Sequence, residues 1–274
     1  MFEGKKNEII ADIKNNKDSA DKIIKCLCHA GEHHNVYYIY YRKLEIVEKI
    51  INSKSLILRN DNYNDIDDEE NLKNPSDSYI KFALCFTYSN AESVAMWYMY
   101  GGDLKTNVRV GYSKKTISNI IQNNQHCLLS VGRLDSDFIK MQEIEEYDIS
   151  ISDVLYYDEM GQNYKVQRGN KNANIDRSTF IDVPRHLLKH VSWNYENECR
   201  IIVHVKKSLL KDGVNAIKLQ IPEVEIEKIK KSIVKSPSFV KDKKNKYKAS
   251  KLTNKIIFPK QTDEKSEENK INDE

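Results

Sequence analysis

A run of alternating residues near the end of the chain constrains the fold more than any other feature. Within Trp193–Val205, Glu196, Glu198 and Arg200 are spaced two apart. Successive side chains of an extended chain point to opposite faces, so this spacing places the three charged groups on one face. The alternate positions are apolar: Cys199, Ile201 and Val203. The run therefore predicts a strand with one core face and one charged face.

The paired carboxylates of Glu196 and Glu198 allow two interpretations. An ion pair with Arg200 would only brace an exposed strand face, which contributes little stability. Alternatively, one carboxylate could stabilise positive charge in a transition state while the other removes a proton from a nucleophile. Two carboxylates this close resist joint ionisation unless a cation is near.

The remaining pattern predicts an α+β fold with a mixed, largely antiparallel sheet and flanking helices, because strands and helices are mixed without strict alternation. We expect a single domain over residues 1–262, opening with a helical segment at 1–35, and a disordered acidic tail at 263–274. Strands are expected at 36–42, 55–59, 80–88, 108–112, 198–205, 216–221 and 256–258, with two or three more between 126 and 157. Helices are expected at 43–53, 89–100, 113–122, 179–191 and 224–234, and a polar loop at 161–176.

Composition excludes several classes of protein. Hydrophobic residues make up 39% of the chain and charged residues 31%, which is typical of a globular protein. No apolar run reaches the roughly 18 residues of a spanning helix, and the N-terminus lacks a signal-peptide pattern, so we expect a cytoplasmic protein with no membrane partner. The nine glycines form no Walker or Rossmann motif.

Two groups of potential metal ligands lack a recognised arrangement. Cys26, Cys28 and His29, followed by His33-His34, match no standard zinc spacing. The pair His186 and His190 is expected on one helix face, but no Glu follows His186 as in zinc proteases. We therefore predict no metal site, and the five scattered cysteines do not suggest a disulfide framework.

Other candidate binding residues lie outside the strand at 198–205. Arg42 ends a tyrosine-rich strand and could bind a phosphate or carboxylate, or be a plain surface residue. Trp97, Tyr98 and Tyr100 could stack on a planar ligand, or pack in the core. Twelve lysines and one acid between Lys228 and Lys260 could contact nucleic acid, or form a solvated surface.

Several short sequence blocks, in their order along the chain, resemble a bacterial family catalogued as domain of unknown function 2971. The resemblance rests on Tyr40-Tyr41-Arg42, Leu56-Ile-Leu58, Asn64-Asp65, Cys85-Phe86-Thr87, Met96-Trp97-Tyr98-Met99-Tyr100 and the segment Trp193–Arg200. It covers about residues 36–240.

The layout is also similar to that of ADP-ribosyltransferases that use an Arg, a Ser/Thr strand and a Glu-x-Glu motif. That similarity implies that Arg42 contacts NAD, Thr87 supports the site, Glu198 holds the nicotinamide ribose and Glu196 positions the acceptor. The tyrosine at 98 or 100 would cover the nicotinamide.

We therefore expect an NAD-consuming ADP-ribosyltransferase-like enzyme, a toxin or phage-defence effector. NAD would be the substrate, the acceptor would be a protein, a nucleic acid or water, and an antitoxin or defence-system partner could accompany it. One rival is a metal-dependent nuclease or nucleic-acid-binding effector that uses the carboxylates and the Lys228–Lys260 region. Another is a non-catalytic binding module in which Glu198 and Arg200 brace the sheet.

Overall fold

The computed structural model describes residues 19–28, 37–60, 78–89, 91–101, 104–134, 138–239 and 247–252. Several expectations fall outside these ranges: most of the helical segment at 1–35, the Asn64-Asp65 block, the strand at 256–258 and the acidic tail. The site residues expected from the sequence all lie inside them.

The larger of two sheets joins ten strands of the described chain, and all its pairings between strands are antiparallel. The strands are β1 (Tyr37–Lys43), β2 (Ser55–Arg59), β3 (Tyr79–Tyr88), β4 (Asn107–Ser113), β5 (Leu129–Arg133), β6 (Ile139–Ile144), β7 (Asp148–Asp153), β12 (Glu198–Lys206), β13 (Ala216–Gln220) and β14 (Val234–Lys235). Their order is β14-β4-β1-β3-β2-β13-β5-β6, and β12 lies between β3 and β7. With the helices described below, this confirms the α+β prediction.

Strand β3 organises this sheet because it has different neighbours along its length. On one edge it pairs with β12 over nine positions, from Glu198 opposite Thr87 to Lys206 opposite Tyr79. On the other edge it pairs with β1 only at Thr87 and Tyr88, and with β2 only at Ala83. Strands β1 and β3 therefore diverge beyond this short pairing, which leaves space between them.

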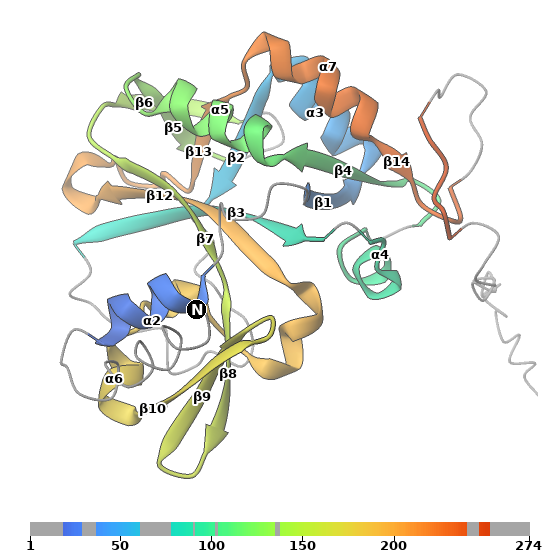
Figure 1. Cartoon of the computed structure of the whole chain (residues 1–274). Coiled ribbons are helices and arrows are strands. Elements are labelled where there is room, and N and C mark those ends of the chain that lie inside the picture. The colour runs from blue at the N-terminus through green and yellow to red at the C-terminus, as the bar shows by residue number, and fades with distance from the viewer. Residues whose placement is uncertain are drawn as a thin grey trace, which may run out of the picture.

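Three helices pack on the large sheet: α3 (Leu44–Ser53), α5 (Lys114–Asn124) and α7 (Glu223–Ser232). All three lie at the top in Figure 1. Helix α5 starts where the Ser113 hydroxyl accepts the backbone N–H of Thr116, which satisfies one of the free donors at a helix start. The apolar side chains of the three helices, for example Ile117 and Ile120 of α5, lie in the main core between the helices and the sheet. A fourth helix, α4 (Val94–Gly101), packs against β1 on the opposite face of this sheet.

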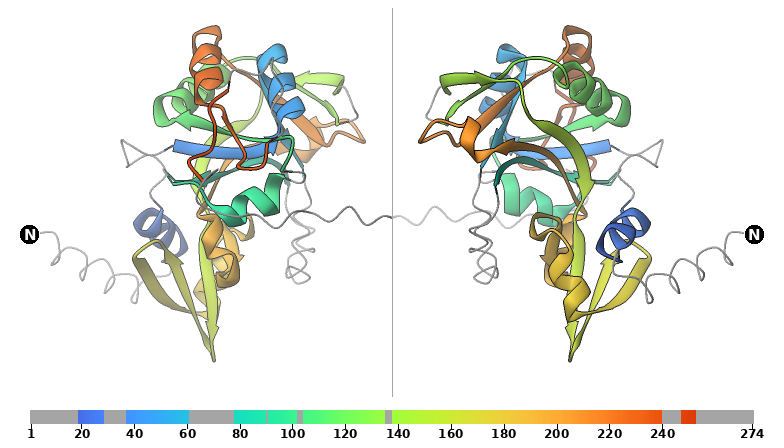
Figure 2. Two further views of the ribbon diagram at one scale, coloured as in Figure 1. Left: turned by 90° about the vertical axis from the view of Figure 1, so that its right-hand side faces the viewer. Right: turned by 90° about the vertical axis from the view of Figure 1, so that its left-hand side faces the viewer.

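The smaller sheet has the order β10-β9-β8-β11 and its own apolar core. Its strands are β8 (Leu155–Met160), β9 (Asn163–Arg168), β10 (Lys171–Asp176) and β11 (Leu188–His190), with helices α2 (Ser19–Leu27) and α6 (Arg177–Asp182) packed against them. Both views of Figure 2 place this unit away from α3, α5 and α7. Strand β7 leads directly into β8, so the chain passes from one sheet to the other there.

The polar loop predicted at 161–176 is wrong, because this segment forms the hairpin of β9 and β10. Gly161 and Gly169 have φ values of 67° and 57° and form the turns before and after β9. Only the inward positions of the hairpin, such as Val166, Ala173 and Ile175, are apolar and buried. Most of the other residues are polar, including the buried Arg168, so the sequence resembles a loop.

The helix predicted at 179–191 is also wrong beyond its first turn. Helix α6 ends at Asp182, and Pro184 disfavours helical geometry in the residue before it. A short 3-10 turn at Arg185–Leu187 follows, and then β11 pairs in parallel with β8. The expected His186/His190 pair on a helix face is therefore not formed.

None of the helices in the described ranges is both long enough and apolar enough to span a membrane.

Candidate functional site

The predicted strand that carries Glu196, Glu198 and Arg200 begins later than its alternation indicates. Glu196 ends a 3-10 helix, η3 (Val191–Glu196), and β12 starts at Glu198. Asn197, between them, has a positive φ of 44°, and its side-chain amide donates to the carbonyl oxygen of Tyr88. The prediction that all three lie on one strand is thus wrong for Glu196, because the chain turns at Asn197.

Glu198 and Arg200 do share one face of β12 and form a bidentate ion pair. Arg200 Nε lies 2.7 Å from Glu198 Oε1, and Arg200 Nη2 lies 3.1 Å from Glu198 Oε2. The remaining Nη1 of Arg200 donates to the His186 carbonyl oxygen at 2.5 Å. The alternate residues Cys199, Ile201 and Val203 lie in the main core, as predicted.

Lys189 connects the two carboxylates. Its Nζ lies 2.5 Å from Glu196 Oε2 and 3.5 Å from Glu198 Oε2. The same ammonium group lies 4.7 Å from the ring centroid of Trp193, at a distance that favours a cation–π interaction. No sequence pattern pointed to this lysine, because it lies in β11, in the segment expected to be helical.

The two carboxylates differ in their expected protonation. Desolvation alone would raise the pKa of Glu198, but the charge and hydrogen bonds of Arg200, with Lys189, outweigh it and lower the pKa to about 2. For Glu196, desolvation prevails over the stabilising contacts with Lys189 and Tyr100, and the pKa is raised. Paired acidic groups whose pKa values are driven apart are typical of acid–base sites.

Tyr100, from α4, completes the surroundings of Glu196. Its hydroxyl donates to Glu196 Oε1. Desolvation and this carboxylate raise the pKa of Tyr100, so the phenol stays protonated and remains a donor at neutral pH.

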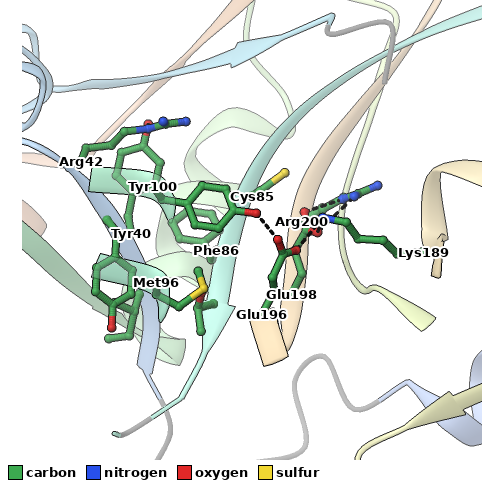
Figure 3. A pocket seen from close by; sticks show the side chains of 13 residues that line it. Tyr40, Arg42, Cys85, Phe86, Met96, Tyr100, Lys189, Glu196, Glu198 and Arg200 are labelled. Atoms are coloured by element: carbon green, nitrogen blue, oxygen red, sulfur yellow. Dashed lines mark hydrogen bonds and ion pairs between the residues drawn. The ribbon is translucent and has the colours of Figure 1, made fainter. Parts of the chain in front are cut away.

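These groups face a partly open cavity of about 310 Å³ where β1 and β3 diverge. Residues from β1, β3, α4, β11, η3 and β12 line it: Ile39, Tyr40, Tyr41, Arg42, Cys85, Phe86, Thr87, Met96, Tyr100, Lys189, Glu196, Glu198 and Arg200. Figure 3 shows Arg42 on one side, the carboxylates on the other, and the rings of Tyr100 and Phe86 between them. The cavity thus has a cationic end, an aromatic wall and a carboxylate end.

Arg42 is held at its end of the cavity by Tyr40. Arg42 Nε donates to the Tyr40 hydroxyl at 3.0 Å, and its guanidinium lies 5.2 Å from the centroid of that ring. A guanidinium fixed in this way suits a phosphate or carboxylate.

Five of the seven predicted site residues meet at this cavity: Arg42, Thr87, Tyr100, Glu196 and Glu198. The other two do not line it. Trp97 is fully buried and packs edge-on against Tyr41, with ring centroids 4.9 Å apart. Tyr98 is 44% exposed and lies on another side of α4.

Cys85 is a further cavity residue that sequence reasoning missed. Its side chain is exposed to the cavity and hydrogen-bonds Glu198. Desolvation and the charge of Glu198 raise its pKa, so it is a thiol rather than a nucleophilic thiolate at neutral pH. Its position on β3, opposite Arg200 of β12, follows from strand pairing that the sequence alone does not specify.

A metal would have to compete with cations already in place. Lys189 contacts both carboxylates and Arg200 contacts that of Glu198, so the negative charge of the two glutamates is largely balanced by protein groups. Across the described ranges, no three His, Cys, Asp or Glu side chains are grouped to hold a metal ion.

The chain matches one family model. No curated protein and no solved structure matches the chain. One family model matches residues 96–201, a region that runs from α4 to β12 and includes Tyr100, Lys189, Glu196 and Glu198 but not Arg42 or Thr87. That model is described as a protein of unknown function (DUF2971), and the match confirms the resemblance to this family for residues 96–201 of the chain.

Proposed function

We propose that the protein is an NAD-consuming, ADP-ribosyltransferase-like enzyme. The observation that carries this proposal is the meeting of Arg42, Thr87, Tyr100, Glu196 and Glu198 at one cavity, although they come from five separate elements. Their order along the chain and their grouping in space both suit that chemistry.

The carboxylate end suits cleavage of the bond between nicotinamide and ribose. When this bond breaks, its electron pair leaves with the nicotinamide nitrogen and positive charge develops on the ribose. The low pKa of Glu198 keeps its carboxylate ionised, so it can stabilise that charge without reorganisation. An acceptor hydroxyl, amine or water then bonds to the ribose carbon, and Glu196, with its raised pKa, can take the proton released.

The rest of the cavity suits the remaining parts of NAD. Arg42 would bind a phosphate, and the rings of Tyr100 and Phe86 would flank the nicotinamide. The volume of about 310 Å³ is at the lower end of the roughly 300–1,000 Å³ range of ligand pockets. A dinucleotide would therefore place one half inside and the other at the open side.

The rival functions have less support from the site geometry. A two-metal or one-metal nuclease needs carboxylates available for Mg²⁺, whereas Glu196 and Glu198 are paired with Lys189 and Arg200. In the lysine-rich region, Lys228 and Lys230 pair with Glu225 and Glu227 on α7. A non-catalytic binding module, in which Glu198 and Arg200 only brace the sheet, is the alternative outcome of the experiment below.

The biological setting stays a prediction. We also propose an effector role as a toxin or in phage defence, a cytoplasmic location and an antitoxin or defence-system partner; the effector role and the partner rest on the resemblance to ADP-ribosyltransferases.

The test is calorimetric titration of the protein with NAD, with nicotinamide release measured in the same samples. In Glu198→Gln, release should fall about a hundredfold, because one preorganised electrostatic group is lost, while the protein stays folded. Glu225→Gln is the matched control: it removes the charge of another buried, lysine-paired carboxylate, between α5 and α7. Full activity in Glu198→Gln, or no binding and no release by the wild type, would contradict the proposal.

A further inference from the structure

We propose that Lys189 is a positioning residue, whose ammonium group ties Glu196 to Glu198 and allows both carboxylates to be ionised in one cavity. Its orienting role in catalysis rests on the proposed function, but its effect on carboxylate ionisation does not. In this proposal Lys189 acts through the two glutamates and not on the substrate itself.

The position of Lys189 is fixed from several sides. The side chain is only 8% exposed, its Nζ contacts both glutamates, and the face of the Trp193 ring covers it. A buried lysine with two carboxylate partners has little freedom to leave them, since an unpaired buried ammonium is strongly unfavourable.

The small sheet supplies this contact. Strand β11 pairs in parallel with β8, which places Lys189 beside Tyr156. The Tyr156 hydroxyl accepts the backbone N–H of Glu198 at 2.8 Å. Two neighbouring residues of the small sheet therefore hold Glu198, the first residue of β12. Lys189 contacts the side chain of Glu198, and Tyr156 contacts its backbone N–H.

The other groups around the pair cannot replace Lys189. Glu196 otherwise faces the hydroxyl of Tyr100, and Glu198 otherwise faces Arg200 and the thiol of Cys85. Within the described ranges, the titratable or charged groups that face the pair are Tyr100 from α4, Cys85 from β3, Tyr156 from β8, Lys189 from β11, Tyr195 from η3 and Arg200 from β12. Lys189 is the only cation among these that contacts Glu196. Without it, Glu196 would face the charge of Glu198 with only a neutral phenol as donor, and ionisation of both groups would be disfavoured.

The direct test is a pH titration of the carboxyl carbons by NMR, in full-length protein containing ¹³C-labelled glutamate. Glu196→Gln and Glu198→Gln assign the two signals. In Lys189→Met, both midpoints should move to higher pH, whereas Lys189→Arg should keep them near the wild-type values. Unchanged midpoints in a folded Lys189→Met variant would overturn the proposal.

A double variant covers the case in which Lys189→Met does not fold. Lys189→Met/Glu196→Gln removes the lysine together with the glutamate it leaves unpaired, so it should be more stable than the single variant. The Glu198 midpoint should be higher in this double variant than in Glu196→Gln alone. Equal midpoints would show that Lys189 does not act on Glu198.

An activity measurement separates this proposal from the proposed function. If the wild type releases nicotinamide, Lys189→Met should shift the acidic limb of its pH–rate profile upward and lower kcat more than it raises KM, because the substrate contacts remain. A fall in activity without any shift of that limb would contradict the positioning role. If the wild type releases none, the proposed function fails, and the NMR titration still decides the role of Lys189.

Discussion

The protein buries charged side chains in two places of very different design. At the junction of the sheets, Asp153 of β7 and Arg168 of β9 form a pair at 3.2 Å, with both side chains almost completely buried. Beside the cavity, two glutamates and two cations form a linked set that faces open space. Both are buried ion pairs, yet only the second leaves room for a ligand and holds two carboxylates together. Burial of charge alone therefore does not mark a candidate site; two linked carboxylates beside a cavity do.

The junction pair is expected to matter most for stability. Arg168→Met would leave the Asp153 carboxylate buried without its cation, which costs about 3–5 kcal/mol of unfolding free energy. Denaturant unfolding measures this loss. The double variant Asp153→Leu/Arg168→Met, which replaces the pair with apolar groups, should recover most of it. A single variant as stable as the wild type would mean that this pair is not structural.

The ion pair of Glu198 and Arg200 beside the cavity is expected to make the free energy of unfolding depend on pH in the acidic range. The pKa of Glu198 is about 2 in the folded protein against 4.5 ordinarily, so its contribution is complete above pH 4.5 and is lost as the pH falls towards 2. A difference of this size corresponds to about 3 kcal/mol. Unfolding free energies measured between pH 6 and pH 2 should therefore fall less steeply in Glu198→Gln than in the wild type. Glu227→Gln is the control at an exposed position: the hydrogen bond and charge of Lys230 also lower the pKa of Glu227, but solvent screens this pair, so the variant should flatten the curve less than Glu198→Gln does.

Glu196 should change the pH dependence of the unfolding free energy in the opposite direction from Glu198, and by a smaller amount. Because its pKa is raised in the folded state, its contribution is complete below pH 4.5 and is lost as the pH rises through the folded value. Relative to Glu196→Gln, the wild type should thus lose stability as the pH rises above 4.5. If the two variants shift the curve in the same direction, the two glutamates do not occupy the distinct environments described above.

The smallest expected effect is on thiol reactivity. Cys85 and Cys127 are both exposed, but desolvation and, after it, the charge of Glu198 raise the pKa of Cys85. We expect iodoacetamide to label Cys85 more slowly than Cys127 in the native protein, as measured by mass spectrometry. In Glu198→Gln, labelling of Cys85 should become several-fold faster, because the thiolate fraction rises. Equal rates in the two proteins would place Cys85 outside the influence of Glu198.

Local patterns predicted much of the large sheet and part of the site. Helices α3, α5 and α7 and strands β1 to β4 lie close to their expected positions, because their apolar spacing matches the face that they bury. Glu198 and Arg200 share a face because strand geometry requires it. The hairpin of β9 and β10 was missed because its strands bury few residues, so its polar composition masks the alternation.

The sequence by itself determined the alternation along β12, and with it the ion pair of Glu198 and Arg200, since two residues of one strand need no other element to meet. It also determined the order in which Arg42, Thr87, Tyr100 and the glutamates occur. Only the tertiary structure decided that these residues share one cavity and that Lys189 contacts both carboxylates. It also decided that Glu196 reaches the cavity from the 3-10 helix before β12, because the chain turns at Asn197. The physical reason is range: alternation acts between neighbours, whereas the place of Lys189 depends on the pairing of β11 with β8, and such pairing of distant segments is not written in either segment alone.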